Sequence, residues 1–235
     1  MLPTDSHPNR PLPSVRLLIA TSNAHKLTEI ASLLAQAATG LEHVQVVGAD
    51  LLPPGPSPVE DGETFKANAV IKAAAFALRA AQLPSAERPD WVLADDSGLC
   101  VEALGGAPGV HSARYAGEAA SDEENNAKLL AAIQHEKNRA AEFVCVLACG
   151  QVRNDPTLAF SPTFTVEGRC AGCIAETPYG GGGFGYDPLF FVPAEGATFA
   201  ELSPQRKNEL SHRGNALRAF GNRFLDALRE PPGMA

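Results

Sequence analysis

The chain has 235 residues, of which 45% are hydrophobic and 20% are charged, a composition typical of an ordinary soluble globular protein. Its formal net charge of -8 argues against a protein whose main task is to grip a nucleic-acid backbone, because that task needs a basic face. A small anionic substrate is compatible with this charge, since a local group of Lys and Arg can oppose the global sign. No apolar stretch is long enough to cross a membrane, so the sequence predicts neither a membrane nor a nucleic-acid partner.

The first 14 residues are polar, contain four prolines and carry Arg10 as their only Arg or Lys. They lack the apolar segment of a secretion signal, so we predict a disordered leader over 1–14 and a cytoplasmic protein. The five cysteines, an odd number, agree with a reducing compartment. No repeat or linker divides the rest, which predicts a single domain over 15–230 and a short tail over 231–235.

The first half of the chain predicts alternating strands and helices. An apolar run over 15–20 predicts a buried strand, and the three polar residues after it supply N-cap side chains for a helix. A second short strand is expected over 44–48, and a second helix from about Thr64, after a proline-rich connection. That helix leads to a further strand over 91–94. This order of elements is typical of an α/β fold.

The second half is richer in strands. Ser121 and Glu124 form a capping-box pattern, which predicts the start of a third helix. Further β-rich runs, of which the first three are expected to pair as adjacent antiparallel strands, cover residues 143–149, 163–167, 170–176 and 190–192. Ser203-Pro204 predicts a short helical turn, and apolar spacing over 217–228 predicts a final amphipathic helix. The whole pattern predicts α/β architecture around a mixed sheet.

Two adjacent carboxylates, Asp95 and Asp96, directly follow the strand expected over 91–94 and precede Ser97-Gly98. We predict a turn here, because Ser and Gly are typical turn residues. Adjacent acids at the end of a buried strand are well suited to hold a divalent cation and a water. The alternative is that they only cap the turn. The long glycine-dense loop over 101–118 favours a site, since such loops beside paired carboxylates usually serve one.

The segment Thr21-Ser22-Asn23-Ala24-His25-Lys26 places hydroxyls, helix N-terminal amides and a lysine directly after a strand. These groups form an anion cradle, because free N–H groups and the helix dipole favour phosphate. The segment lacks the glycine spacing of a P-loop. The alternative is a plain N-cap followed by a solvated lysine.

Polar side chains also surround the start of the second helix. Asn68 and Lys72 are four residues apart, so they share a helix face and can address one ligand. Glu60 can reach a cation jointly with Asp96, whereas Glu63 more simply complements the helix dipole.

Two later segments add aromatic, acidic and basic groups. A glycine run over 180–183 ends in Phe184-Gly185-Tyr186-Asp187, whose exposed aromatics can stack on a flat base while the acid accepts from ring N–H groups. The alternative is a hairpin with its aromatics in the core. Lys207 and Ser211-His212-Arg213 precede the last helix and can donate to carbonyl or phosphate oxygens. Cys170 and Cys173 have the spacing of a redox or zinc pair, but in a strand they would point to opposite faces.

These clusters, in this order, resemble the inosine triphosphate pyrophosphatase family, also called the Ham1 family. The resemblance extends from Val15 to about Leu228. Two departures are the acid in Glu60-Asp61-Gly62, where members often have Glu-Thr-Gly, and the proline-rich insertion over 53–58. The motifs that carry the resemblance are Thr21 to Lys26, Thr64-Phe65-Lys66-Ala67-Asn68-Ala69, Ala94 to Gly98 with Leu104 to Gly109, Phe184 to Pro188, and Ser211-His212-Arg213-Gly214.

The resemblance implies an elongated mixed β-sheet flanked by helices, with the active site in a central cleft between two lobes. It also implies that a homodimer hydrolyses ITP, dITP and XTP to the monophosphate and pyrophosphate with Mg²⁺. Carried over by position, Asp96 would be the general base and a metal ligand, and Glu60 a second metal ligand. Substrate would be held by Thr21, Ser22, Asn23, Ala24, His25, Lys26, Lys72, Ser97, Phe184, Gly185, Tyr186, Asp187, Lys207, His212 and Arg213.

In this mechanism water attacks the α-phosphorus, Asp96 orients the water, and Asp95 supports the site from behind, because strand neighbours point to opposite faces. Arg213, as a buried donor, would favour 6-oxo purines over adenine. Two alternatives are a noncatalytic purine-nucleotide sensor on the same fold and a Maf-like pyrophosphatase for modified pyrimidine nucleotides. The intact Asp96, Glu60 and Lys26 count against the sensor, and the motifs at 184–187 and 211–214 count against the pyrimidine enzyme.

Overall fold

A seven-stranded mixed sheet with the strand order β2-β1-β3-β4-β5-β6-β7 forms the centre of the protein. The structure is a computed structural model that describes residues 14–21, 23–37, 40–153, 160 and 162–229. Most of the predicted leader and tail therefore lies outside the described residues, and the domain boundaries stay a prediction. The strands are β1 Val15–Ile19, β2 Val44–Val47, β3 Trp91–Val101, β4 Ala140–Gln151, β5 Phe164–Ile174, β6 Phe190–Val192 and β7 Ala197–Thr198.

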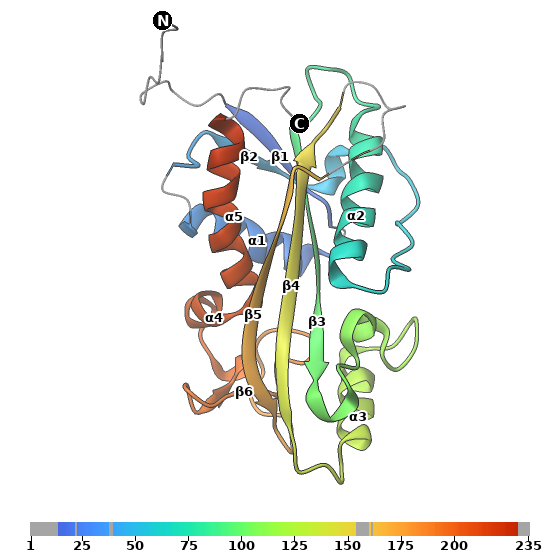
Figure 1. Cartoon of the computed structure of the whole chain (residues 1–235), viewed down its shortest axis with the longest axis vertical. Helices are drawn as coiled ribbons and strands as arrows, with labels where there is room; N and C mark the ends of the chain where they lie inside the picture. The colour runs from blue at the N-terminus through green and yellow to red at the C-terminus, as the bar shows by residue number, and fades with distance from the viewer. Residues whose placement is uncertain (1–13, 22, 38–39, 154–159, 161, 230–235) are drawn as a thin grey trace, which may run out of the picture.

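Strand β1 pairs in parallel with both β2 and β3, whereas every later pair, from β3 to β7, is antiparallel. The long strands β3, β4 and β5 run along the long axis of the molecule (Figure 1). The predicted α/β fold around an elongated mixed sheet is thus confirmed. The helices are α1 Ala24–Ala37, α2 Phe65–Ala80, α3 Asp122–Ala132, α4 Pro204–Leu210 and α5 His212–Arg229.

Helices cover both faces of the sheet at the end where β1 and β2 lie. Helices α1 and α5 pack on one face and α2 on the other, while α3 lies beside the far half of β3 (Figure 1). Along β3 the side chains alternate between these layers, because successive residues of a strand point to opposite faces. Leu93 packs with α1 and α5, Val92 packs with α2, and Leu99 joins a third apolar cluster with Phe143 and Phe190. The middle of β3 therefore lies where three apolar clusters meet.

The turn expected at Asp95-Asp96-Ser97-Gly98 is wrong, because β3 continues through it to Val101. Pairing with β4 is unbroken from Trp91 opposite Gln151 to Val101 opposite Ala141. Asp95 and Asp96 can remain within the strand because charged side chains on both faces of the sheet pair with them.

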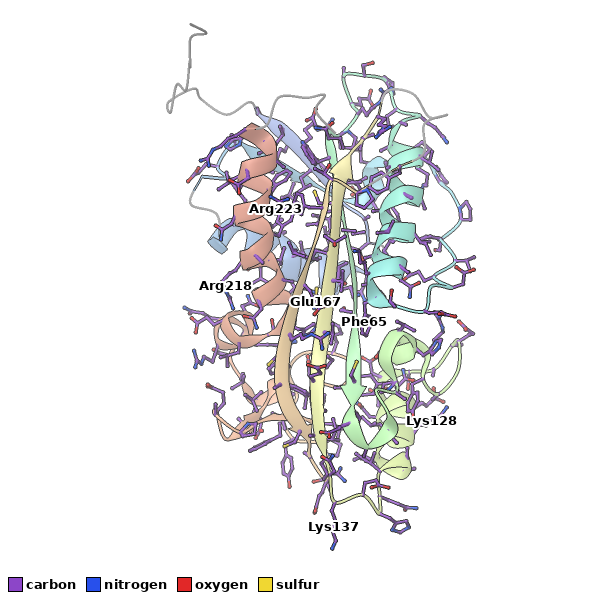
Figure 2. The ribbon with its side chains drawn as sticks, viewed as in Figure 1. Phe65, Lys128, Lys137, Glu167, Arg218 and Arg223 are labelled. Atoms are coloured by element: carbon purple, nitrogen blue, oxygen red, sulfur yellow. The ribbon has the colours of Figure 1, made fainter. Side chains whose placement is uncertain are left out.

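Gly98 does not form a turn; it allows neighbouring segments to pack closely against β3. A Cβ at this position would lie 2.4 Å from Gly109 O and 2.9 Å from a ring carbon of Phe65. Phe65 lies at the start of α2, next to the middle of β3 (Figure 2). The glycine therefore lets the loop after β3 and the start of α2 pack against this strand.

The two β-rich runs expected over 163–167 and 170–176 are one strand, β5. Gly168, between them, pairs with Cys145 of β4. A Cβ on Gly168 would lie 2.2 Å from His212 O and 2.3 Å from Ala216 N, so this glycine lets the first turn of α5 pack on the strand. From the sequence alone Gly168 is interpreted as the end of a strand. In the structure it lies within the strand, and the close packing of α5 explains why the residue is glycine.

The helix starts predicted at Thr64, Ser121 and Ser203-Pro204 are confirmed. The hydroxyl of Thr64 accepts from Ala67 N at 3.1 Å, and Ser121 and Glu124 form both bonds of the capping box. Helix α5, however, begins at His212, so His212 and Arg213 lie in its first turn and not ahead of it. Among the helices of the described ranges, none combines the length and the apolar character that a membrane span requires.

Candidate functional site

Asp95 lies at the centre of a buried group of charges on the face of β3 that packs against α1 and α5. Its Oδ1 accepts from Lys26 Nζ at 2.6 Å, and its Oδ2 accepts from Arg213 Nε at 3.1 Å. Burial raises the pKa of Asp95, but the charges of Arg213 and Lys26 outweigh burial and hold that pKa well below its usual value. Asp95 is therefore ionised and orients two cations.

Arg213 connects three elements that are far apart in the sequence. Besides Asp95 it donates to Glu29 Oε2 of α1 at 2.7 Å and to Ser97 Oγ of β3 at 2.9 Å. Only 2% of its surface is exposed. A guanidinium carries five N–H donors, so these three bonds leave donors for a ligand. Burial opposes its charge, yet Asp95 and Glu29 raise the pKa of Arg213 above its usual value.

Asp96 points to the opposite face of the strand, toward α2. Its Oδ1 lies 4.0 Å from Lys72 Nζ, and the same ammonium group lies 2.9 Å from Glu60 Oε2. Burial raises the pKa of Asp96 to about 6 despite the charge of Lys72. Its Oδ2 is buried and has no hydrogen-bond partner among the residues that the structure describes. One carboxylate oxygen is thus available to a ligand.

A cavity of about 310 Å³ adjoins the middle of β3. The Phe184 ring forms part of its wall, with Lys207 Nζ 5.1 Å and Arg213 Cζ 6.0 Å from the ring centre. Lys207 Nζ also donates to Asp187 Oδ2 at 2.6 Å. An aromatic face flanked by two cations suits a flat, electron-rich ligand with acceptor atoms.

His212 lines the same cavity as a neutral imidazole. Its ring stacks on Phe143 with centroids 4.7 Å apart. Burial, assisted by the charge of Arg213, holds the pKa of His212 well below its usual value. A neutral ring can donate from one nitrogen and accept at the other, so it can read a polar edge of a ligand.

The structure brings most of the predicted substrate-binding residues together around this cavity. Thr21 lies apart from its lining, as do Lys72 and the pair Glu60 and Asp96. Ser22 lies outside the described residues, and the side chains of Ala24 and His25 are not described. Those that line the cavity are Asn23, Lys26, Ser97, Phe184, Gly185, Tyr186, Asp187, Lys207, His212 and Arg213.

The predicted anion cradle has the geometry of a capped helix start. Thr21 Oγ1 accepts from Asn23 N at 3.1 Å, and Asn23 Oδ1 accepts from Lys26 N at 3.1 Å. Helix α1 begins at the next residue, Ala24. The N-cap interpretation is confirmed for Asn23. The solvated lysine of that alternative is wrong, because Lys26 reaches across to Asp95 and Ser97.

The expected exposure of Tyr186 is wrong, and Asn68 has a structural partner that the sequence did not predict. Tyr186 is only 4% exposed, and its hydroxyl donates to Ser112 O at 2.9 Å, so it packs in the core instead of presenting a stacking face. Asn68 is buried and its Oδ1 accepts from Gly62 N at 2.8 Å, so this oxygen holds the loop before α2, and a ligand shared with Lys72 stays a prediction. In both cases a nearby backbone group satisfies the polar atom.

Sequence reasoning missed two side chains that contact this group. Glu29 follows Lys26 by three residues on α1, so helical spacing was a signal that could have found it. Cys145 Sγ lies 3.1 Å from Asp95 Oδ2, a contact that depends on the register of β4 and leaves no mark in the local sequence. Cys170 and Cys173 lie in β5, and in the described parts of the chain no three His, Cys, Asp or Glu residues form a metal-binding group.

Comparison with known proteins finds similar sequences and structures over most of the chain. The Ham1 family matches residues 17–223. A protein of Geobacillus kaustophilus named dITP/XTP pyrophosphatase is 47% identical over 203 residues, which cover 86% of this chain and 90% of that protein. The solved structure of a HAM1 protein from Coxiella burnetii has a TM-score of 0.72 at 36% identity and covers 90% of this chain and 99% of that one.

A crystal structure from Mycobacterium abscessus, described as a nucleoside-triphosphatase or dITP/XTP pyrophosphatase, has a TM-score of 0.66 at 37% identity. The match covers 87% of this chain and 97% of that chain. The similarity in sequence and in structure thus spans most of this chain and nearly all of each protein compared with it. The chain therefore belongs to the Ham1 family.

Proposed function

We propose that this protein hydrolyses non-canonical purine nucleoside triphosphates, namely ITP, dITP and XTP, to the nucleoside monophosphate and pyrophosphate. The observation that carries the proposal is that two adjacent acids of β3 contact different sets of charged side chains on opposite faces of the strand. Asp95 orients Lys26 and Arg213 beside the cavity, whereas Asp96 faces Lys72 and Glu60 on the other side of the strand. The names of the curated relatives support the same reaction.

The cavity is the site proposed for the purine base. Arg213 and Lys207 would donate to the 6-oxo oxygen of hypoxanthine or xanthine, and the Phe184 ring would cover the base. Adenine carries an amino group there, so a buried donor would face another donor. Leaving a buried polar group unpaired costs about 1–3 kcal/mol, which predicts that ATP is a poor substrate.

Glu60 and Asp96 are the residues proposed to hold Mg²⁺. The unpartnered Oδ2 of Asp96 fits a cation, because Mg²⁺ prefers oxygen ligands and commonly takes one or two carboxylates from the protein. When bound, Mg²⁺ neutralises phosphate charge and lowers the pKa of water. Lys72, which contacts both carboxylates, offsets part of the repulsion between their charges.

The chain's own residues would do the rest of the chemistry. The capped start of α1, with Lys26, would bind the negative triphosphate through backbone amides and an ammonium group. Asp96 would orient the attacking water toward the α-phosphorus and accept its proton. Asp95 would touch neither water nor phosphate and would hold Lys26 and Arg213 in position.

A panel of nucleoside triphosphates, scored for pyrophosphate release, tests this proposal. We expect ITP, dITP and XTP to be hydrolysed about fivefold to 160-fold more efficiently than ATP, the range that one unpaired buried donor implies. A chelator should abolish turnover, and added Mg²⁺ should restore it. Equal efficiency for ATP and ITP would refute the assignment of the cavity. Nucleotide binding without turnover would favour the sensor, and preferred turnover of modified pyrimidine nucleotides would favour the Maf-like enzyme.

The homodimer and the cytoplasmic location expected from the sequence stay predictions. Size-exclusion chromatography with light scattering, run on the full chain, tests the first directly. A mass of one chain would contradict the dimer.

A further inference from the structure

Helix α3 holds the peptide groups of Gly185 from both sides. Gly185 N donates to Asp122 Oδ2 at 2.6 Å, and Gly185 O accepts from Asn126 Nδ2 at 3.0 Å. Asp122 and Asn126 are four residues apart, so they lie one turn apart on the same face of α3. We call this pair of contacts the α3 clamp.

The clamped residue adjoins the wall of the base cavity. Gly185 directly follows Phe184 and has a φ of 62°, a left-handed conformation that suits glycine. Phe184 N donates to Asp187 Oδ2 at 2.9 Å, and the Phe184 ring faces Lys207 and Arg213. A shift of the Gly185 peptide would therefore move the Phe184 ring relative to both cations.

Open space lies on both sides of this wall. Asp122, Phe184 and Gly185 all line the cavity of about 310 Å³ and also a second cavity of about 440 Å³. The second cavity extends between α3 and the glycine run over 180–183. With a cavity on each side, packing alone does not fix the position of the wall, and directional hydrogen bonds at Gly185 do so instead.

We infer that Asp122 and Asn126 are positioning residues that set the distance between the Phe184 ring and the base-reading cations, and thereby set base selectivity. This inference rests on the proposed function. Neither residue was predicted from the sequence to take part in the site. Their bonds act on the base side of the site, whereas Asp96, Glu60 and Lys72 lie on the other face of β3. Loss of the α3 clamp should thus weaken base recognition and spare the chemical step.

Asn126 offers a way to separate positioning from stability. It is 9% exposed, and its Oδ1 is buried without a hydrogen-bond partner among the described residues. The only hydrogen bond of its side chain within that part of the chain is the one to Gly185 O. Leucine has nearly the same shape and removes a poorly satisfied amide. Gly185 is only half-buried, so water can bind its carbonyl group when Asn126 is replaced, and Asn126→Leu should fold nearly as stably as the parent protein while losing one half of the α3 clamp.

Three variants test Asp122. Asp122→Ala removes the acceptor for Gly185 N, and we expect KM for ITP to rise about tenfold with kcat within about twofold of the parent, as loss of one charge-assisted hydrogen bond implies. Asp122→Asn keeps a carbonyl oxygen in the same place and should stay within about threefold of the parent KM. Glu123→Ala is the matched control, because it removes the same charge from the same helical turn and Glu123 has no hydrogen bond to Gly185.

Two inhibitors show which half of the site is affected. Inosine monophosphate carries the base, whereas inorganic pyrophosphate does not. Asp122→Ala and Asn126→Leu should raise the inhibition constant of inosine monophosphate severalfold or more and leave that of pyrophosphate unchanged. Unchanged KM and inhibition constants in both variants, or equal weakening of both inhibitors, would overturn the inference. Failure of the parent protein to release pyrophosphate from ITP would instead overturn the proposed function.

Discussion

Replacing Asp96 by Asn is expected to reduce pyrophosphate release from ITP by about a hundredfold to ten-thousandfold, the range for loss of a general base. The amide has the same shape, but it is a far weaker proton acceptor and a poor ligand for a hard cation. The fold should survive, because burial already opposes the charge of Asp96 and its Oδ2 makes no hydrogen bond within the described residues. Steady-state assays at saturating Mg²⁺ and thermal unfolding of the same preparation measure both effects.

The informative outcome is the combination of these two measurements. Near-normal turnover by a folded Asp96→Asn protein would refute its catalytic role. A large loss of stability would show that Asp96 serves the fold. A matched control is Asp90→Asn, because Asp90 lies just before β3 and accepts from Arg16 N at 2.7 Å, away from the cavity. This variant should keep full activity.

Replacing Asp95 by Asn should have the opposite result for stability. Asp95 is almost completely buried and pairs with Lys26 and Arg213, so the substitution leaves two cations without their shared counter-ion. Removing one partner of a buried ion pair typically costs about 3–5 kcal/mol of unfolding free energy. Urea unfolding of the Asp95→Asn and Asp96→Asn proteins, run side by side, measures the difference.

The Asp95→Asn and Asp96→Asn proteins are well matched for comparison, because the two residues are adjacent and the substitution is the same. A loss of less than about 1 kcal/mol in Asp95→Asn would contradict the buried charge cluster described here. If Asp95→Asn does not accumulate as folded protein, the milder variant Arg213→Lys still tests the cluster. Lysine keeps the charge but loses the planar fork that reaches Asp95, Glu29 and Ser97 at once. It should therefore also lower the unfolding free energy.

Local sequence patterns predicted the parts of the fold that depend on local chemistry. The helix starts at Thr64 and Ser121 follow from capping side chains that act over three residues. The alternation within β3 correctly placed Asp95 and Asp96 on opposite faces. The extent of β3 and β5 was not predictable in the same way, because Gly98 and Gly168 look like strand breaks until the neighbours packed against them are known.

The site likewise combines features that local sequence predicts with contacts that depend on tertiary packing. Asp96, Lys26 and Arg213 could be predicted as site residues because they lie in short segments that are unusually rich in polar residues. Of their partners, Glu29 was missed, since Glu29 and Arg213 are 184 residues apart in the sequence and meet only through packing of α1 beside α5. The α3 clamp on Gly185 likewise joins residues 63 positions apart. Contacts of this kind follow from tertiary structure and not from local propensity.

Hydrolysis of ITP in water enriched in ¹⁸O tests the central claim most directly, because the position of the label identifies the phosphorus that is attacked. With Asp96 directing water to the α-phosphorus, one ¹⁸O atom is expected in inosine monophosphate and none in the released pyrophosphate. Label in pyrophosphate, or release of orthophosphate as the first product, would contradict the account.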